Sequence, residues 1–213
     1  MDKLHFCREL TVEEVLDIYS SIAPLHFPKA ELKPIENVKK YLENGLYTGY
    51  GFYENETLLA YALFLILPKK RKLLLDYYAV LEEYRNDGIG SAFLQSLRAE
   101  LTCADGIYIE AENPDYAENE QEKGIQEKRI AFYDRNGAVF TGVLSTLFGV
   151  PYRVLYLPLQ KSENQNSSFH FDMTAGEINF YQEIDLIYRT MFSPDIYARK
   201  VKLECNQGVK SLY

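Results

Sequence analysis

The chain has 213 residues, of which 47% are hydrophobic and 14% aromatic, and its 23 Lys and Arg against 31 Asp and Glu give a formal net charge of −8. This composition excludes an intrinsically disordered chain. The net acidity argues against a protein that binds nucleic-acid phosphates, because such a protein needs clustered Lys and Arg. The longest apolar run, residues 58–67, is about half as long as a membrane-spanning helix.

The cysteines and the first residues indicate the compartment. Cys7, Cys103 and Cys205 are far apart and include no Cys-x-x-Cys pair, so they predict neither a disulfide framework nor a metal site. Residues 1–10 lack the long apolar core of a signal peptide. We therefore expect a cytoplasmic protein that binds neither a membrane nor a nucleic acid.

The first part of the chain predicts a strand, two helices and three further strands. Thr11 and Glu14 form a capping box for a helix through about residue 22, which Pro24 and Pro28 should end. The predicted elements in chain order are a strand at 4–7, helices at 11–22 and 34–43, and strands at 47–53, 57–67 and 73–81.

The second part alternates helices and strands and ends in a separate helix. The predicted elements are a helix at 88–101, a strand at 107–111, a helix at 125–136, strands at 139–147 and 152–159, and a polar linker at 160–168. A capping box of Thr174 and Glu177 then opens an amphipathic helix that reaches Met191. The order predicts an α/β fold with a mixed, mostly antiparallel central sheet and flanking helices. We expect a domain at 1–160 and a C-terminal helical extension at 161–213, packed on the domain or on a second subunit.

The loop before the predicted helix at 88–101 has the features of an anion site. Gly88 and Gly90 open the helix, so its first backbone N–H groups point at the loop and no Cβ blocks a phosphate. Arg85 adds positive charge at the rim. The pattern GxxxxGK[ST] of a P-loop is absent, and Phe93 stands where a dinucleotide fingerprint has its third glycine. A tight turn that needs glycine only for its geometry is the alternative interpretation.

Two motifs resemble those of the GNAT superfamily of acetyl-CoA-dependent N-acetyltransferases. Arg85-x-x-Gly88-x-Gly90, after a predicted strand, is similar to the pyrophosphate-binding motif Q/R-x-x-G-x-G/A of that family. Residues 129–138, RIAFYDRNGA, are similar to its penultimate-helix motif A-x-x-x-Y-E-x-x-G-F. The predicted order of elements also matches, and the resemblance covers roughly residues 1–159.

The resemblance implies the acyl-CoA N-acyltransferase fold, with acetyl-CoA as co-substrate and no metal. The backbone of Val80 would pair with the pantetheine arm, and the loop N–H groups would hold the pyrophosphate. Tyr133 falls where the family often places a general acid for the leaving thiolate, and a phenol stays protonated at pH 7. Among 18 tyrosines, a core or groove aromatic is the alternative for this residue. The coenzyme-binding residues so implied are Ala79, Val80, Leu81, Arg85, Asn86, Asp87, Gly88, Ile89, Gly90, Ser91 and Arg129.

Three features depart from the family pattern. Gln126 stands where many members have an Asn seven residues before the tyrosine. Arg129 replaces a usual small residue, either to reach a coenzyme phosphate or to cap the neighbouring surface. Residues 113–124 form a longer connection than is usual, so we expect a remodelled acceptor side.

A base must take a proton from the acceptor amine, and three strand carboxylates are candidates. Glu110 lies where some relatives place a catalytic glutamate, and Glu112 faces the same side two residues on. Asp76 follows three leucines, an unusual place for a carboxylate because burial is costly unless the charge is paired. Each could instead be a salt-bridged or solvated strand residue. His26 lies in the acceptor-side connection, where a packing or surface role is the stronger interpretation and a catalytic role the weaker one.

The expected activity is direct acetyl transfer from acetyl-CoA to a primary amine of a small cationic or amino-acid-like acceptor. Acetylation of a protein N-terminus or lysine is one alternative, and a non-catalytic coenzyme A-binding module is another. A homodimer is left open. Residues 110–127 carry seven acids and one base, so they contribute −6 of the −8. They are either a solvated acidic loop or a feature that draws in a cationic acceptor.

Overall fold

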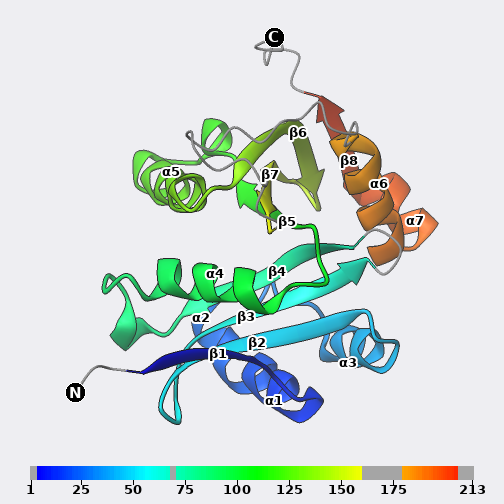
Figure 1. Ribbon diagram of the computed structural model, residues 1–213. Helices are drawn as coiled ribbons and strands as arrows, with labels where there is room; N and C mark the ends of the chain where they lie inside the picture. The colour runs from blue at the N-terminus through cyan, green and yellow to red at the C-terminus, as the bar shows by residue number, and fades with distance from the viewer. Residues whose placement is uncertain (1–3, 68–70, 160–178, 206–213) are drawn as a thin grey trace. The chain divides into compact units, whose positions relative to one another are not determined.

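A computed structural model describes residues 4–67, 71–159 and 179–205. The chain divides into two compact units, Met1–Ile107 and Tyr108–Tyr213, and Figure 1 labels the helices and strands of both. Within the described residues, no helix combines the length and the apolar character needed to cross a bilayer.

The first unit is an antiparallel sheet in the order β1-β2-β3-β4, with helices on both faces. Its elements are β1 (His5–Glu9), α1 (Val12–Asp17), a π-helical turn (Ile18–Ile22), α2 (Ala23–His26), α3 (Ile35–Glu43), β2 (Tyr47–Glu54), β3 (Thr57–Leu67), β4 (Lys72–Val80), a 3-10 turn (Glu82–Tyr84) and α4 (Ile89–Glu100). The central strand β3 is buried as predicted, since residues 59–65 are each at most 2% exposed.

Two adjacent tyrosines of β4 show which helices cover which face of this sheet. Side chains of consecutive strand residues point to opposite faces. Tyr77 packs edge-on against Tyr19 and Phe27, in the segment that carries α1 and α2. Tyr78 instead stacks on Phe93 of α4. The helix after the predicted phosphate loop therefore covers one face, and the N-terminal helical segment covers the other (Figure 1).

The first helical segment confirms its predicted start but not its predicted end. The Glu14 N–H donates to Thr11 Oγ1 at 3.2 Å, and the Glu14 carboxylate accepts from the Thr11 N–H at 2.8 Å. The prediction that Pro24 ends the helix is wrong, because the helical run continues through α2 to His26. The π-helical turn precedes Pro24, which lies in the first turn of α2, where its missing N–H removes no helical hydrogen bond.

The second unit holds strands in the order β5-β7-β6-β8, and β6 pairs antiparallel with both β7 and β8. Its elements are β5 (Gly106–Glu112), a 3-10 turn (Pro114–Tyr116), α5 (Glu120–Arg135), β6 (Val139–Leu147), β7 (Val150–Pro158), α6 (Phe180–Met191), α7 (Pro194–Lys200) and β8 (Val201–Cys205). The predicted α/β class with a mostly antiparallel sheet is confirmed.

Helices α5 and α6 lie on opposite faces of β7. Leu155 lines a cavity together with Ile130 of α5. Its neighbour Tyr156 packs against Tyr108 of β5 and Phe180 of α6. Because consecutive strand residues point to opposite faces, this assignment is unambiguous.

The predicted long connection before α5 is wrong. The helix begins at Glu120 rather than residue 125, so only residues 113–119 separate it from β5. The Asn119 side chain accepts from the Glu122 N–H at 2.9 Å, and acids in the first turn interact favourably with the helix dipole. These effects start the helix where the sequence offers few apolar residues.

The C-terminal region contains more structure than predicted. The helix expected there is present as α6, which Asn179 caps by accepting from the Gln182 N–H at 3.0 Å. Helix α7 and strand β8 were not predicted. The linker at 160–168 and the capping box of Thr174 and Glu177 lie outside the described residues.

Candidate active site

The predicted phosphate loop joins the end of β4 to the start of α4 and has an unusual backbone. Asn86 and Gly88 both adopt positive φ, 70° and 76°, and Gly88 is the residue that precedes the helix. The Ala92 N–H donates to the Gly88 carbonyl at 3.0 Å, as the first hydrogen bond of the helix. Helix geometry therefore directs the preceding N–H groups, at Ile89 and Gly90, out of the N-terminus. This is the backbone arrangement that an anion requires.

Two side chains fix this loop to β4. Tyr78 donates from its hydroxyl to the Gly90 carbonyl at 2.6 Å, which ties the first turn of α4 to the strand. Arg85 donates from Nε to the Val80 carbonyl at 3.1 Å, so its guanidinium lies over the end of the strand. The loop therefore presents its positive charge beside the residue that the resemblance assigns to the pantetheine arm.

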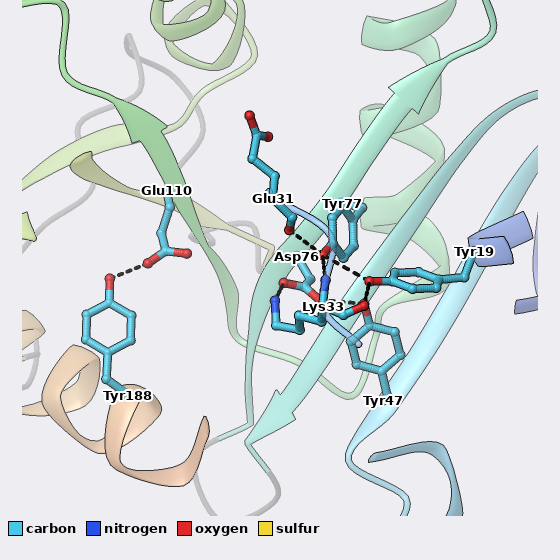
Figure 2. A network of polar contacts seen from close by, with 8 residues as sticks. All are labelled: Tyr19, Glu31, Lys33, Tyr47, Asp76, Tyr77, Glu110 and Tyr188. Carbon is cyan, nitrogen blue, oxygen red and sulfur yellow. Dashed lines mark hydrogen bonds and ion pairs between the residues drawn. The ribbon is translucent and has the colours of Figure 1, made fainter. Parts of the chain in front are cut away.

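Asp76 lies in a buried polar network of the first unit (Figure 2). Its side chain is 7% exposed, its Oδ1 forms an ion pair with Lys33 Nζ, and its Oδ2 accepts from the Tyr47 hydroxyl at 2.5 Å. Burial and the charge of Asp76 raise the pKa of Tyr47 well above 10, so this phenol remains a donor. Both carboxylate oxygens thus have strong partners, as a buried charge needs.

The same network holds the segment before α3 against β4. Tyr77 donates to the Glu31 carbonyl at 2.9 Å and accepts from the Lys33 N–H at 3.2 Å. Tyr19 donates to the Lys33 carbonyl at 2.8 Å. The residues around Asp76 therefore position the connection between α2 and α3 (Figure 2).

Glu110 of β5 meets a side chain from α6. Its Oε1 accepts a hydrogen bond from the Tyr188 hydroxyl (Figure 2). Tyr188 is 1% exposed, and burial together with the charge of Glu110 raises its pKa well above 10. The C-terminal extension therefore reaches one of the predicted catalytic carboxylates.

The ion pair of Glu112 and Arg129 connects the end of β5 to α5, the helix that also carries Tyr133. Arg129 Nη1 donates to Glu112 Oε2 at 2.8 Å, with both side chains partly exposed. Tyr133 is buried, and burial raises its pKa to about 12 against an opposing effect of the Arg129 charge. A phenol with this pKa is protonated throughout the physiological range.

The remaining polar candidates differ in their surroundings. Gln126 is buried on α5, where its Nε2 donates to Glu122 Oε1 at 3.2 Å and its Oε1 has no hydrogen-bond partner among the described residues. His26 lies 3.1 Å from the Tyr61 hydroxyl and stacks on that ring. Burial and the nearby Arg85 charge lower the pKa of His26, which keeps the ring neutral at pH 7.

Sequence reasoning missed the partners of the strand carboxylates. Lys33 comes from a connection, and Tyr188 comes from the extension, where only its place on the apolar side of the helix was a signal. A cavity of about 330 Å³ beside α5 is lined by none of the four predicted catalytic residues. Among the described residues, no group of three or more His, Cys, Asp or Glu could hold a metal ion.

Comparison with known proteins gives a family match and a set of structural neighbours. The model of the Acetyltransferase (GNAT) family matches residues 12–137, more than half of the chain, and includes both motifs up to Gly137. No curated protein sequence matches the chain.

Solved structures resemble the chain at low sequence identity. The ribosomal-protein-S18-alanine N-acetyltransferase from Escherichia coli is 18% identical, with a TM-score of 0.53, and covers 78% of this chain and 100% of its own. The aminoglycoside 6'-N-acetyltransferase from Enterococcus faecium is 16% identical, with a TM-score of 0.56, and the match covers 75% of this chain and 99% of that enzyme. An aminoglycoside 6'-N-acetyltransferase complexed with coenzyme A is also 16% identical, with a TM-score of 0.57, and the match again covers 75% of this chain and 99% of that enzyme. These likenesses show the fold.

Proposed function

Because the chain belongs to the acetyltransferase (GNAT) family and is therefore an N-acetyltransferase, we propose that it transfers acetyl from acetyl-CoA to a primary amine of a small, cationic or amino-acid-like acceptor. The proposal that the chain binds acetyl-CoA is supported mainly by the backbone of the loop before α4. Its two positive-φ residues, Asn86 and Gly88, aim the first N–H groups of the helix outward. The residues implied by the resemblance therefore fit a pyrophosphate.

In the proposed reaction the amine nitrogen attacks the thioester carbonyl carbon directly. A C–N bond forms, the C–S bond breaks through a tetrahedral intermediate, and coenzyme A leaves as a thiolate. Glu110, directly or through water, accepts the proton that the amine loses. Tyr133 donates a hydrogen bond to the developing thiolate, and solvent supplies the proton that gives the neutral thiol.

The pKa of Tyr133, about 12, defines this role more closely. A thiol has an ordinary pKa of about 8.5, so a phenol of higher pKa holds its proton more tightly than the thiol does. Tyr133 therefore acts by hydrogen bonding to the charge as it develops, and it keeps its own proton.

We assign the two other carboxylates different roles. Asp76 shares its charge with Lys33 and accepts from Tyr47, which suits an anchor for the acceptor-side connection rather than a base. Glu112 is hydrogen-bonded to Arg129, so we propose that this pair orients the end of β5 against α5. Arg129 remains a proposed ligand of a coenzyme phosphate.

The acceptor preference rests on the acidic residues of β5, of the connection after it and of the first half of α5. Two of the seven acids at 110–127 already have cationic partners, Glu112 with Arg129 and Asp115 with Arg153. The local field is therefore less negative than the sequence alone suggests. It still favours an acceptor with one or two positive charges over an acidic one.

The proposal is tested by following free thiol from acetyl-CoA over a panel of diamines, amino-acid amides, aminosugars, peptides with free N-termini, and matched alcohols. We expect release with a small primary amine and none with the alcohol of the same shape. Release with peptides alone would support the peptide alternative. Tight coenzyme binding without release on any acceptor would leave only a non-catalytic module.

A matched pair of glycine variants tests the loop. Gly90→Asp should abolish coenzyme A binding in calorimetry, because it puts a negative side chain beside the pyrophosphate. Gly124→Asp, on α5 where an added Cβ meets no atom within 4 Å, serves as the control and should bind normally. Equal binding by both variants would contradict the assignment of this loop.

A further inference from the structure

The extension helix α6 and the strand β5 exchange two phenol–carboxylate hydrogen bonds. Tyr188 of α6 donates to Glu110 of β5, and Tyr108 of β5 donates to Glu183 Oε2 of α6 at 2.5 Å. Tyr108 and Glu110 are two residues apart and therefore point to the same face of the strand. Each element thus contributes one phenol and one carboxylate, and the two contacts have the same chemistry.

The contact at Glu110 includes a third polar group, the hydroxyl of Ser145. Tyr188 and Ser145 of β6 are 1% and 2% exposed, and their hydroxyl oxygens lie 3.0 Å apart. A phenol has a single proton, so a hydroxyl that donates to Glu110 is left to accept from Ser145, which counters the upward shift of the Tyr188 pKa. Tyr152 of β7 is another titratable group that acts on this phenol, and its charge raises the Tyr188 pKa further.

We propose that Tyr188 is a positioning residue that holds Glu110 ionised and correctly aimed, so that the C-terminal extension completes the catalytic machinery. This inference rests on the proposed function, in which Glu110 accepts the amine proton. A hydrogen bond donated to a carboxylate favours its charged form. The phenol cannot swing away, because its ring is enclosed and its oxygen also contacts Ser145.

This role differs from simple packing of the extension. The apolar residues Ile184 and Ile187 of α6 are each 1% exposed and account for its attachment through burial alone. A helix that needed only to pack would not require a hydroxyl on a strand carboxylate. The Tyr108–Glu183 contact offers the comparison, since it fastens the same two elements without touching Glu110.

The test compares Tyr188→Phe with Tyr108→Phe, because each variant removes one phenol hydroxyl from the contact between β5 and α6. In Tyr188→Phe, the acidic limb of the kcat profile should move up by about one pH unit, since one charge-stabilising hydrogen bond is lost. Below that limb the rate should fall about tenfold, with the KM for acetyl-CoA unchanged. Both variants should lower the melting temperature by a similar amount. Tyr108→Phe should leave the pH profile of kcat in place.

Carboxyl NMR of protein labelled with ¹³C-glutamate gives a readout that does not need turnover. The titration midpoint of Glu110, assigned with Glu110→Gln, should rise by about one unit in Tyr188→Phe and stay unchanged in Tyr108→Phe. An unshifted midpoint and an unshifted acidic limb would overturn the role of Tyr188 while leaving the proposed reaction intact. A shifted midpoint in a protein that acetylates no amine would support the electrostatic contact and overturn the proposed reaction.

Discussion

Two strand carboxylates of this protein accept hydrogen bonds from buried tyrosines, yet their surroundings suit them to different work. Asp76 of β4 has an ammonium group on one oxygen and a phenol on the other. Glu110 of β5 accepts from a phenol, Tyr188, whose second neighbour is the hydroxyl of Ser145. The first carboxylate is paired with a full positive charge, and the second accepts from a neutral hydroxyl in the contact described for it.

One fold can therefore hold one carboxylate as a structural anchor and leave another suited to accept a proton. Asp76 forms an ion pair with Lys33 in a mostly buried position, and breaking such a pair is costly. Glu110 accepts from a neutral phenol, which favours its charged form more weakly than an ion pair would. A carboxylate with a neutral donor suits a proton acceptor, and one that forms an ion pair suits an anchor.

The largest effect on rate should come from Glu110→Gln. An amide of the same shape still accepts from Tyr188 but cannot take a proton, so kcat at neutral pH should fall by roughly 10²–10⁴-fold. Coenzyme affinity and melting temperature should remain close to those of the wild type. Steady-state kinetics and calorimetry measure these quantities. A fall of less than tenfold would mean that Glu110 is not the base and would break the comparison.

Asp76→Asn should have the largest effect on stability. It leaves the Lys33 ammonium facing an amide in a mostly buried position, and breaking such a pair costs about 3 kcal/mol. Urea unfolding should show this loss in the free energy of unfolding. Asp76→Asn combined with Lys33→Met, which removes the stranded charge, should recover most of it. Full stability with a large loss of kcat would instead make Asp76 a catalytic residue.

The sequence was sufficient for most elements because their signals are local. Apolar alternation and continuous apolar runs located β2, β3 and β4, and Thr11 with Glu14 located the first helix. The start of α5 was missed because its first turn is held by the Asn119 cap and the helix dipole rather than by an apolar face. Strand β8 was missed because its five residues carry no turn signal and gain their order from pairing with β6.

The sequence predicted which residues belong to the candidate site but not which side chains contact them. The motifs pointed to the loop at 85–91 and to Tyr133 through residues close together in the chain. The partners of the carboxylates are remote, since Lys33 and Asp76 are 43 residues apart and Glu110 and Tyr188 are 78 apart. Such pairs depend on strand pairing and helix rotation, which no local pattern specifies. The acidic run at 110–127 also hid that Arg153, from β7, neutralises part of it.

Tyr133→Phe should have an effect on kcat smaller than that of Glu110→Gln. This variant tests how the leaving thiolate is stabilised. Removing the phenol hydroxyl should lower kcat by roughly tenfold or more and leave coenzyme affinity nearly unchanged. Turnover equal to the wild type would remove Tyr133 as the donor to the thiolate.

The same variant should change the alkaline stability of the protein. Burial raises the pKa of Tyr133 from about 10 to about 12 in the folded state, so its contribution to stability is complete below pH 10 and is lost as the pH rises through 12. Between pH 10 and 12 the free energy of unfolding should therefore fall by roughly 2 kcal/mol less in Tyr133→Phe than in the wild type. Parallel loss in the two proteins would contradict the burial of this phenol.

The smallest effect is expected for Tyr47→Phe, the counterpart in the first unit of the change at Tyr188. It removes the phenol hydroxyl from Asp76 Oδ2 but leaves the ion pair with Lys33 in place, so the free energy of unfolding should drop by about 1 kcal/mol. Its kcat and pH profile should match those of the wild type, because the change leaves the ion pair of Asp76 with Lys33 in place. Both variants delete one phenol that donates to a strand carboxylate, and only the one facing Glu110 should move the acidic limb. A shifted limb in Tyr47→Phe would mean that the two carboxylates are coupled, and that ion pairing does not isolate Asp76 from the chemistry.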